Sequence, residues 1–172
     1  MSGETTLNNF DVDLKYSLAT NDDMEINDSY FRIFCDLKKV DLVNDPLLQK
    51  QGIDKILIFK NGKEVWIDEK KRRKDYGDIL LEEYSDFDQK KVGWLSKEKK
   101  TDYIAYVIWK PRKLYLLPFK LLQLAWRENY KEWLKHYGRK FAQNKGYRTS
   151  NIPVPAETLL SAIKDQIKQE LI

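Results

Sequence analysis

One pair of segments constrains the fold of this chain more than any other part of it. Residues 53–59 and 63–70 are rich in Ile, Val, Phe and Trp, and Asn61-Gly62 joins them. Such residues favour strands, and Asn-Gly is the strongest short-range signal for a hairpin turn. The sequence therefore predicts an antiparallel hairpin on which the remaining strands assemble.

The open end of this hairpin carries charged residues in an otherwise apolar strand pair. Asp54 opens the first strand, and Asp68, Glu69 and Lys70 end the second. Because side chains alternate along a strand, Asp68 and Lys70 project to one face and Glu69 to the other. Neighbouring carboxylates repel one another unless a cation lies between them, and Mg²⁺ prefers such oxygen ligands. We therefore expect a Mg²⁺ or Mn²⁺ site, with Lys70 activating the attacking water or neutralising charge on a phosphoryl group.

These residues resemble the PD-(D/E)xK phosphodiesterase superfamily, which includes type II restriction endonucleases and Holliday-junction resolvases. Asp54 matches its first acid and Asp68-Glu69-Lys70 its (D/E)xK element, although Gly52-Ile53 stands where the motif has Pro. The resemblance implies that Asp54, Asp68 and the main-chain carbonyl of Glu69 ligate the metal, while Lys70 assists the water. It covers roughly residues 25–120, and the ordered segments 45–54, 66–70, 80–85, 93–95 and 101–103 make it similar to phage and mobile-element proteins.

Two registers of the hairpin are compatible with the sequence. A two-residue turn at Asn61-Gly62 places Asp54 opposite Glu69, makes Glu69-Lys70-Lys71 the acid-x-lysine element, and matches the apolar pairs slightly better. A three-residue loop over 60–62, with Gly62 in a left-handed conformation, places Asp54 opposite Asp68. We favour the second register because the resemblance selects Asp68 with Lys70 and because bulges near active sites re-aim side chains.

Apolar spacing and turn residues predict the other elements. We expect helices over 27–39 and 157–171, a helical stretch over 121–141, and strands over 40–43, 78–84, 103–109 and 114–117. A single domain then comprises a polar lead-in (1–24), a catalytic core (25–118) and a basic helical extension (119–172). The predicted fold is α/β and restriction-endonuclease-like: a mixed central β-sheet flanked by helices, with a basic helical C-terminal region.

Positive charge is concentrated in one part of the chain. Eleven Lys and Arg residues lie between positions 110 and 148 against Glu128 and Glu132, so this stretch carries +9 in a chain of net charge +4. Such a block suggests a polyanionic partner, because Lys and Arg beside phosphates release counterions, and a solvated lysine-rich helix explains it equally well. The expected partner is DNA, and the residues expected to contact it are Lys71, Arg72, Arg73, Lys113, Arg127, Lys131, Arg139 and Lys140.

Three further residues are candidates for the site. Glu25, or Asp28 in its place, lies at the start of the first expected helix, which often supplies another acid in the superfamily. Glu82 lies on the neighbouring strand and either extends the metal site or faces solvent. Gln49 either positions a substrate or stabilises the turn before Asp54.

The remaining features bound the class of protein. Cys35 is the sole cysteine, which excludes an internal disulfide and suggests a reducing compartment. The chain has neither a leader nor an apolar run of about 20 residues, so we expect no membrane contact and a cytoplasmic location, in the host cell if a phage encodes it. The expected function is a Mg²⁺- or Mn²⁺-dependent endonuclease that hydrolyses DNA. The alternative is a non-catalytic nucleic-acid- or protein-binding accessory factor of a phage or mobile element. Whether DNA or RNA is the substrate, whether branched structures are selected, and whether two chains pair as a homodimer stay open.

Overall fold

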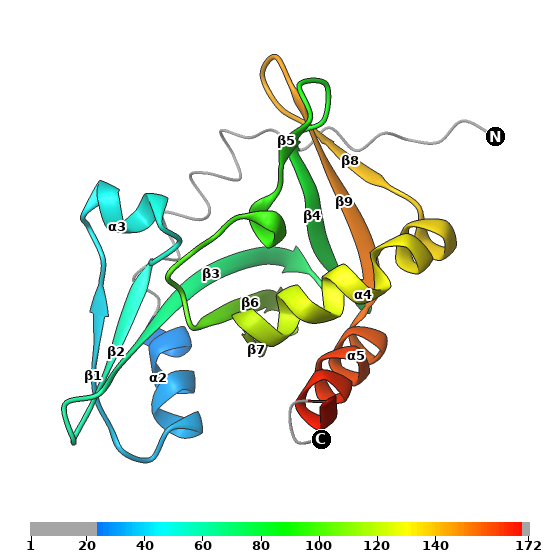
Figure 1. Cartoon of the computed structure of the whole chain (residues 1–172). Coiled ribbons are helices and arrows are strands. Elements are labelled where there is room, and N and C mark those ends of the chain that lie inside the picture. Colours follow the sequence, from blue (N-terminus) through cyan, green and yellow to red (C-terminus); the bar gives the residue numbers. More distant parts are fainter. Residues whose placement is uncertain (1–23, 170–172) are drawn as a thin grey trace.

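Two β-sheets form the frame of the molecule (Figure 1). The structure, a computed structural model, describes residues 24–169. One sheet contains β1 (Leu37–Leu42), β2 (Lys55–Phe59), β3 (Glu64–Lys74), β6 (Tyr103–Lys110) and β7 (Lys113–Pro118), in that spatial order. The other contains β5 (Lys91–Val92), β4 (Asp78–Asp86), β9 (Arg148–Pro155) and β8 (Lys140–Gln143), also in that order. The helices are α2 (Met24–Ile33), α3 (Pro46–Lys50), α4 (Phe119–Tyr137), α5 (Ala156–Gln169) and the 3-10 helix η1 (Trp94–Ser96).

The predicted hairpin is present as β2 and β3, and its register is the one with the three-residue loop. Lys55 pairs with Ile67 and Ile58 with Glu64. The amide of Phe59 donates to the carbonyl of Lys63, and Gly62 has a φ of +84°. A left-handed conformation costs glycine little, because glycine has no Cβ. The alternative register, in which Asp54 faces Glu69, is therefore wrong.

The first sheet is mixed, as predicted. β1, β2 and β3 form an antiparallel meander, whereas β3 and β6 run parallel. β6 then pairs antiparallel with β7, which confirms the expected strand pair over 103–109 and 114–117. A parallel neighbour requires a long crossover connection, and here that connection contains β4, β5 and η1.

Helices cover both faces of this sheet, and each face has its own apolar core. On one face Ile26 and Tyr30 of α2 pack against Ile67 and Ala105. On the other face, side chains of α4 and α5 pack with alternate residues of β6 and with the second sheet. The mixed α/β architecture with a mixed central sheet flanked by helices is therefore the one predicted from the sequence.

Three predicted elements differ from the structure. The helix expected over 27–39 ends at Ile33, because Leu37 begins β1 and pairs with Phe59 of β2. The strand expected over 78–84 exists as β4, but it belongs to the second sheet. The helix expected over 121–141 ends at Tyr137, after which Gly138 adopts a φ of +64°.

The C-terminal region is not wholly helical, because β8 and β9 lie between α4 and α5. Pro153 and Pro155 belong to β9, where they pair with Leu80 and Asp78 of β4. β8 pairs only with residues 148–151, so both prolines lie on a stretch of β9 with a strand on one side alone. Proline is tolerated there because it need not donate to a second neighbour. The expected catalytic core (25–118) and the expected extension (119–172) therefore both contribute strands to the second sheet.

The sequence also predicted a polar lead-in at the N-terminus and no membrane contact. The polar lead-in over 1–24 lies outside the described residues, except that Met24 is the first residue of α2. Within residues 24–169 the structure has no helix that combines the length and the apolar character needed to cross a membrane.

Candidate active site

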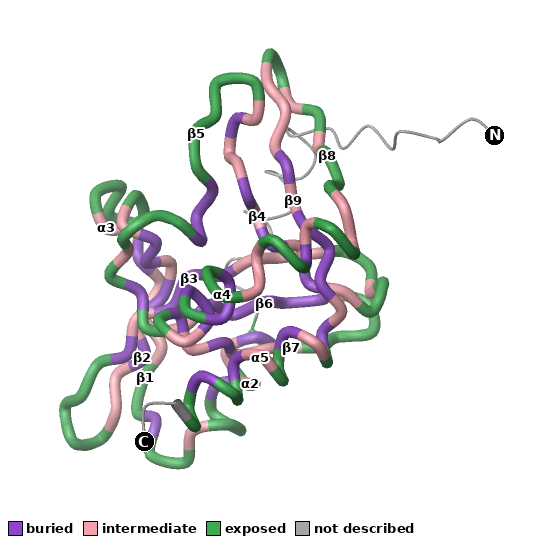
Figure 2. Tube along the Cα trace, turned by 45° about the vertical axis from the view of Figure 1, so that its right-hand side comes forward, coloured by how far each residue is buried: buried purple, intermediate pink, exposed green. Residues whose placement is uncertain are grey.

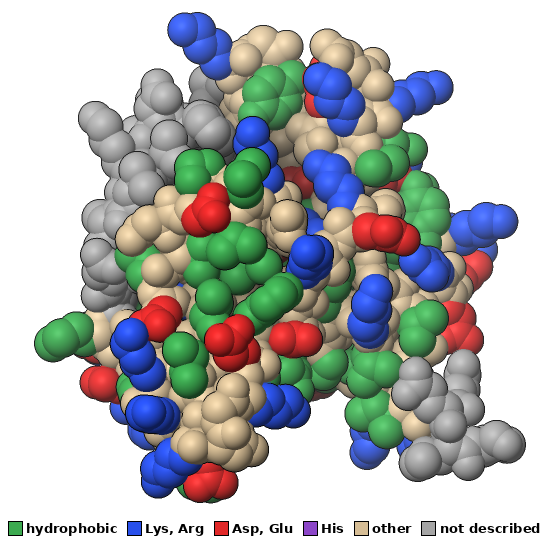
Figure 3. Space-filling model, turned by 60° about the vertical axis from the view of Figure 1, so that its left-hand side comes forward, with side chains coloured by type: hydrophobic (Ala, Val, Ile, Leu, Met, Phe, Trp, Pro, Cys, Tyr) green, Lys and Arg blue, Asp and Glu red, His purple; other side chains and the backbone are tan. Residues whose placement is uncertain are grey.

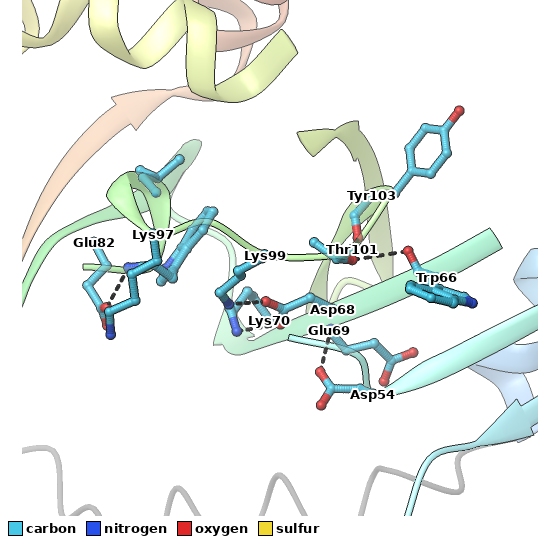
Figure 4. A network of polar contacts seen from close by, with 12 residues as sticks. Asp54, Trp66, Asp68, Glu69, Lys70, Glu82, Lys97, Lys99, Thr101 and Tyr103 are labelled. Atoms are coloured by element: carbon cyan, nitrogen blue, oxygen red, sulfur yellow. Dashed lines mark hydrogen bonds and ion pairs between the residues drawn. The ribbon is translucent and has the colours of Figure 1, made fainter. Parts of the chain in front are cut away.

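The acid and lysine residues predicted from the hairpin come together at its open end (Figure 4). Asp54 lies directly before β2, and its amide donates to the carbonyl of Ile67 at 2.8 Å. Asp68 and Lys70 project from β3 to the same face, and Lys70 Nζ lies 2.5 Å from Asp68 Oδ1. Only 1% of the Asp68 side chain is exposed, whereas 31% of Lys70 is. Solvent therefore reaches this pair through Lys70, and Asp54 is partly exposed as well.

A second lysine, which is not among the residues predicted from the sequence, shares the same carboxylate. Lys99 Nζ lies 2.5 Å from Asp68 Oδ2, so each oxygen of Asp68 contacts one ammonium group. Burial by itself would raise the pKa of Asp68, but Lys70 and Lys99 outweigh burial and lower this pKa below its usual range. Burial likewise opposes the charge on Lys70, yet Asp68 outweighs burial and raises the pKa of Lys70. Asp68 and Lys70 are therefore a carboxylate and an ammonium at neutral pH.

Asp54 has different surroundings. Its Oδ2 accepts a hydrogen bond from the main-chain amide of Glu69 at 2.7 Å, and its Oδ1 has no hydrogen-bond donor among residues 24–169. Burial and the neighbouring Asp68 raise the pKa of Asp54. A cation placed between the two carboxylates would remove this repulsion, because an opposite charge favours the ionised form.

The main chain of Glu69 also turns toward Asp54. The carbonyl of Ile67 and the amide of Glu69 both point to the β2 side of β3, since each is bonded to Asp54. In a strand the amide and carbonyl of one residue point to the same side. The carbonyl of Glu69 therefore projects past the end of β2, on the side of the Asp54 carboxylate.

The Glu69 side chain lies on the opposite face of the sheet, beneath α2. Its Oε1 accepts from the Tyr30 hydroxyl at 2.8 Å and lies 3.0 Å from Lys55 Nζ. Its Oε2 lies 3.3 Å from Lys71 Nζ, and 6% of the Lys71 side chain is exposed. Lys55 is buried as well and donates to Asn27 of α2 at 2.8 Å. This charged network fixes the segment whose main chain faces Asp54.

The chain between β5 and β6 positions Lys99 and includes two segments that carry the superfamily resemblance. At one end, the ring of Trp94 lies 5.8 Å from Lys70 Nζ and 5.9 Å from Lys99 Nζ. At the other end, Asp102 exchanges hydrogen bonds with the main chain of Trp66. Between these two ends, Gln123 of α4 donates to the carbonyls of Leu95 and Lys97 and so holds the central part of the connection. The signal for Lys99 in the sequence was its place between these two segments.

Gly52 packs against this cluster, which gives a first testable prediction. A Cβ at Gly52 would lie 2.7 Å from Lys99 Cδ and 3.1 Å from Asp68 Oδ2, and its φ of +76° disfavours other residues. We expect Gly52→Ala to lower the free energy of unfolding by about 2 kcal/mol. Gly62→Ala is the matched control, because its φ is +84° but nothing lies within 4 Å. Urea denaturation of both variants separates crowding from backbone strain, and equal losses would contradict a tight Gly52 contact.

The three accessory candidates have different outcomes. Glu82 of β4 lies near Lys70 and accepts from the amide of Trp94 at 3.1 Å (Figure 4). Gln49 donates to the carbonyl of Val43 at 2.8 Å and so stabilises the turn before Asp54. Glu25 is not brought to the cluster: it forms an ion pair of 2.6 Å with Arg112, and its helix packs on the opposite face from Asp68.

Most residues expected to contact DNA are already in ion pairs. Besides the pair of Lys71 with Glu69, Arg72 contacts Asp78, Lys113 contacts Asp75, Arg139 contacts Glu83 and Lys140 contacts Asp78. Lys71 is held by Glu69 and 6% of its side chain is exposed, so its contact with DNA stays a prediction. Arg73, Arg127 and Lys131 are exposed. Acidic side chains of the protein thus neutralise many of the Lys and Arg residues that were expected to contact a polyanionic partner.

The oxygen atoms at the cluster are of the type that binds a hard cation such as Mg²⁺. Within residues 24–169 no group of three or more His, Cys, Asp or Glu side chains is arranged to hold a metal. The donors that converge are two carboxylates and one main-chain carbonyl. Each carboxylate oxygen has two lone pairs, so a lysine contact on Asp68 leaves acceptor capacity. Two carboxylates completed by water and phosphate are the usual ligands of Mg²⁺, and this set fits that pattern.

Comparisons with known proteins add no relative for this chain. No family model, no curated protein and no solved structure matches it. The residues and their geometry are therefore the basis on which a function is inferred.

Proposed function

We propose that this chain is a Mg²⁺- or Mn²⁺-dependent phosphodiesterase that cleaves DNA, with its active site at the open end of the β2–β3 hairpin. The observation that carries the proposal is the convergence of Asp54, Asp68 and Lys70. The hairpin register puts the acids next to each other, and Lys70 Nζ lies 2.5 Å from Asp68. The resemblance to PD-(D/E)xK nucleases concerns these same three residues.

Each group has a role that follows from its position. Asp54, Asp68 and the carbonyl of Glu69 would hold the metal ion, which polarises a phosphoryl oxygen and activates water when bound. Lys70 and Lys99 offset the charge of the two carboxylates, so that a phosphodiester can approach them. Trp94 shields both ammonium groups on one side, which strengthens their attraction for a phosphate by lowering the local dielectric constant.

Cleavage assays on variants test this proposal. Asp54→Asn and Lys70→Ala should each lower the rate of DNA cleavage in Mg²⁺ or Mn²⁺ by on the order of a hundredfold or more, because each removes a charge from the reacting centre. Glu64→Gln is the matched control: it lies on β3, is exposed, and changes one charge at the far end of the hairpin. Linear duplex, single-stranded and four-way-junction DNA serve as substrates. Wild-type rates in Asp54→Asn would refute the assignment.

One observation favours a second candidate, a non-catalytic module that binds nucleic acid or protein. Both oxygens of Asp68 are held by lysines, which makes the cluster charge-balanced without a metal. In that case Mn²⁺ added in a calorimeter gives no heat with either the wild type or Asp54→Asn. For the metal-dependent enzyme, heat is expected with the wild type and is lost in Asp54→Asn.

A further inference from the structure

The second sheet extends into an arm made of two hairpins. We define the arm as residues 84–92 with the turn between β4 and β5, and residues 139–148 with the turn between β8 and β9. The two turns lie side by side at the end of the molecule and are exposed (Figures 1 and 2). The amide of Phe87 donates to the carbonyl of Arg148 at 2.7 Å and joins the hairpins there.

The arm is held in place relative to the candidate active site. β4 carries Glu82, which bonds to the amide of Trp94 beside the two site lysines. The arm begins two residues further along the same strand. At its base, Arg139 makes two hydrogen bonds of 2.6 and 2.7 Å to the buried Glu83, which also accepts from Ser150 at 2.8 Å. A ligand on the arm would therefore stand at a fixed place relative to Lys70.

The arm is basic even after its ion pairs are counted. It contains six Lys and Arg residues against Asp86 and Asp88. Asp86 and Asp88 pair with Lys91 and Arg148, and two acids outside the arm, Glu83 and Asp78, pair with Arg139 and Lys140. Lys90 and Lys145, one in each turn, have no acidic partner among the described residues. Figure 3 shows Lys and Arg side chains around this end of the molecule.

Aromatic rings accompany these charges. Phe87 and Phe141 meet edge to face with ring centroids 4.9 Å apart. The guanidinium of Arg148 lies 5.4 Å from the ring of Phe87 and 5.2 Å from that of Phe141. Phe141 is 40% exposed on the edge strand of its sheet. An exposed ring next to cations is the arrangement on which an unpaired base stacks, whereas a duplex hides the faces of its bases.

We propose that the arm binds single-stranded DNA and presents it to the candidate active site. Lys90 and Lys145 contact backbone phosphates, and Phe141 stacks on a base. This inference names the substrate class and so rests on the proposed function for its biological meaning. Binding itself does not require that the site be active.

Fluorescence anisotropy tests the arm separately from catalysis. The full chain carrying Asp54→Asn is titrated against labelled oligothymidylate of about 20 nucleotides and against a duplex of the same length. We expect tighter binding of the single strand. K90E/K145E in this background should weaken single-strand binding at least tenfold and flatten its dependence on salt, because two phosphate contacts are lost. K60E/K63E makes the same charge change at two exposed lysines of the β2–β3 turn and should leave single-strand binding nearly unchanged.

A second variant tests the stacking role. Phe141→Ala should weaken single-strand binding about tenfold and duplex binding little, since only an unpaired base offers its face. Circular dichroism and thermal melting establish that both arm variants are folded. Equal losses in K90E/K145E and K60E/K63E, duplex binding as tight as single-strand binding, or an unchanged affinity in Phe141→Ala would each overturn the proposal. If the wild type does not cleave DNA but these binding results are obtained, the proposed function is refuted and the arm remains a site that binds single-stranded DNA.

Discussion

Replacing Asp68 by asparagine is expected to abolish cleavage and to destabilise the fold by about 3 kcal/mol. Asp68 is 1% exposed, and its two oxygens lie 2.5 Å from the ammonium groups of Lys70 and Lys99. Asparagine keeps the shape but removes the charge, so two neighbouring ammonium groups lose their counterion. Breaking a buried pair by removing one partner typically costs 3 to 5 kcal/mol. Urea denaturation and a cleavage assay in Mn²⁺ measure the two effects.

The pH dependence of this loss has a definite sign. The pKa of Asp68 is lower in the folded protein than in the unfolded chain, so its contribution is complete above the unfolded value of about 4 and disappears as the pH falls through the folded value. The stability difference between wild type and Asp68→Asn should therefore be largest near pH 7 and shrink below about pH 4. Asp41→Asn, which breaks the exposed pair of Asp41 with Lys39, is the control and should cost about 0.5 kcal/mol or less. A difference independent of pH would contradict the ion-pair account.

Glu83→Gln is expected to destabilise the protein by about 3 kcal/mol without any part in chemistry. Glu83 is 5% exposed, and its carboxylate accepts from Arg139, Ser150 and the hydroxyl of Tyr130. These donors come from α4, from β9 and from the segment between α4 and β8, so one carboxylate joins β4 to three other parts of the chain. Glutamine removes the charge and turns an amide donor toward other donors, which leaves polar groups unsatisfied. Thermal melting measures the loss.

The neighbouring Glu82 provides the control for this prediction. It lies on the same strand, but its carboxylate accepts a hydrogen bond from the main-chain amide of Trp94. The side-chain carbonyl oxygen of glutamine can accept the same hydrogen bond. Glu82→Gln should therefore cost less than about 1 kcal/mol. The pKa of Tyr130 supplies an independent readout, since burial and the bond to Glu83 raise it to about 12. In Glu83→Gln it should fall toward 10, measured as the absorbance difference from the Tyr130→Phe variant during alkaline titration. An unchanged tyrosine titration would contradict this contact.

The hairpin is the part of the fold and of the candidate site that could be predicted from local sequence. Its strands are specified by β-branched and aromatic residues. Its register was not, because the apolar pairs slightly favoured the other register and the resemblance selected the one that the structure has. Once that register is given, Asp54 must lie at the same end of the hairpin as Asp68 and Lys70. The β6–β7 pair was predictable for the same reason, because its strands are adjacent in sequence. The split of the charge cluster between two faces follows from the alternation of side chains in β3.

Other features depend on segments that are distant in sequence, and only the tertiary structure decided them. Lys99 reaches Asp68 because Trp94, Asp102 and Gln123 hold the connection before β6 against the first sheet. β9 forms because β4 offers it a partner, and β8 then pairs with β9, although β9 contains Pro153 and Pro155 and proline is uncommon in strands. Lys71 was expected on a basic surface, and the tertiary structure pairs it with Glu69. Residue type and spacing determine which face of an element is apolar and which local pairings form, whereas the partner that a charge or a strand edge finds depends on how the whole chain packs.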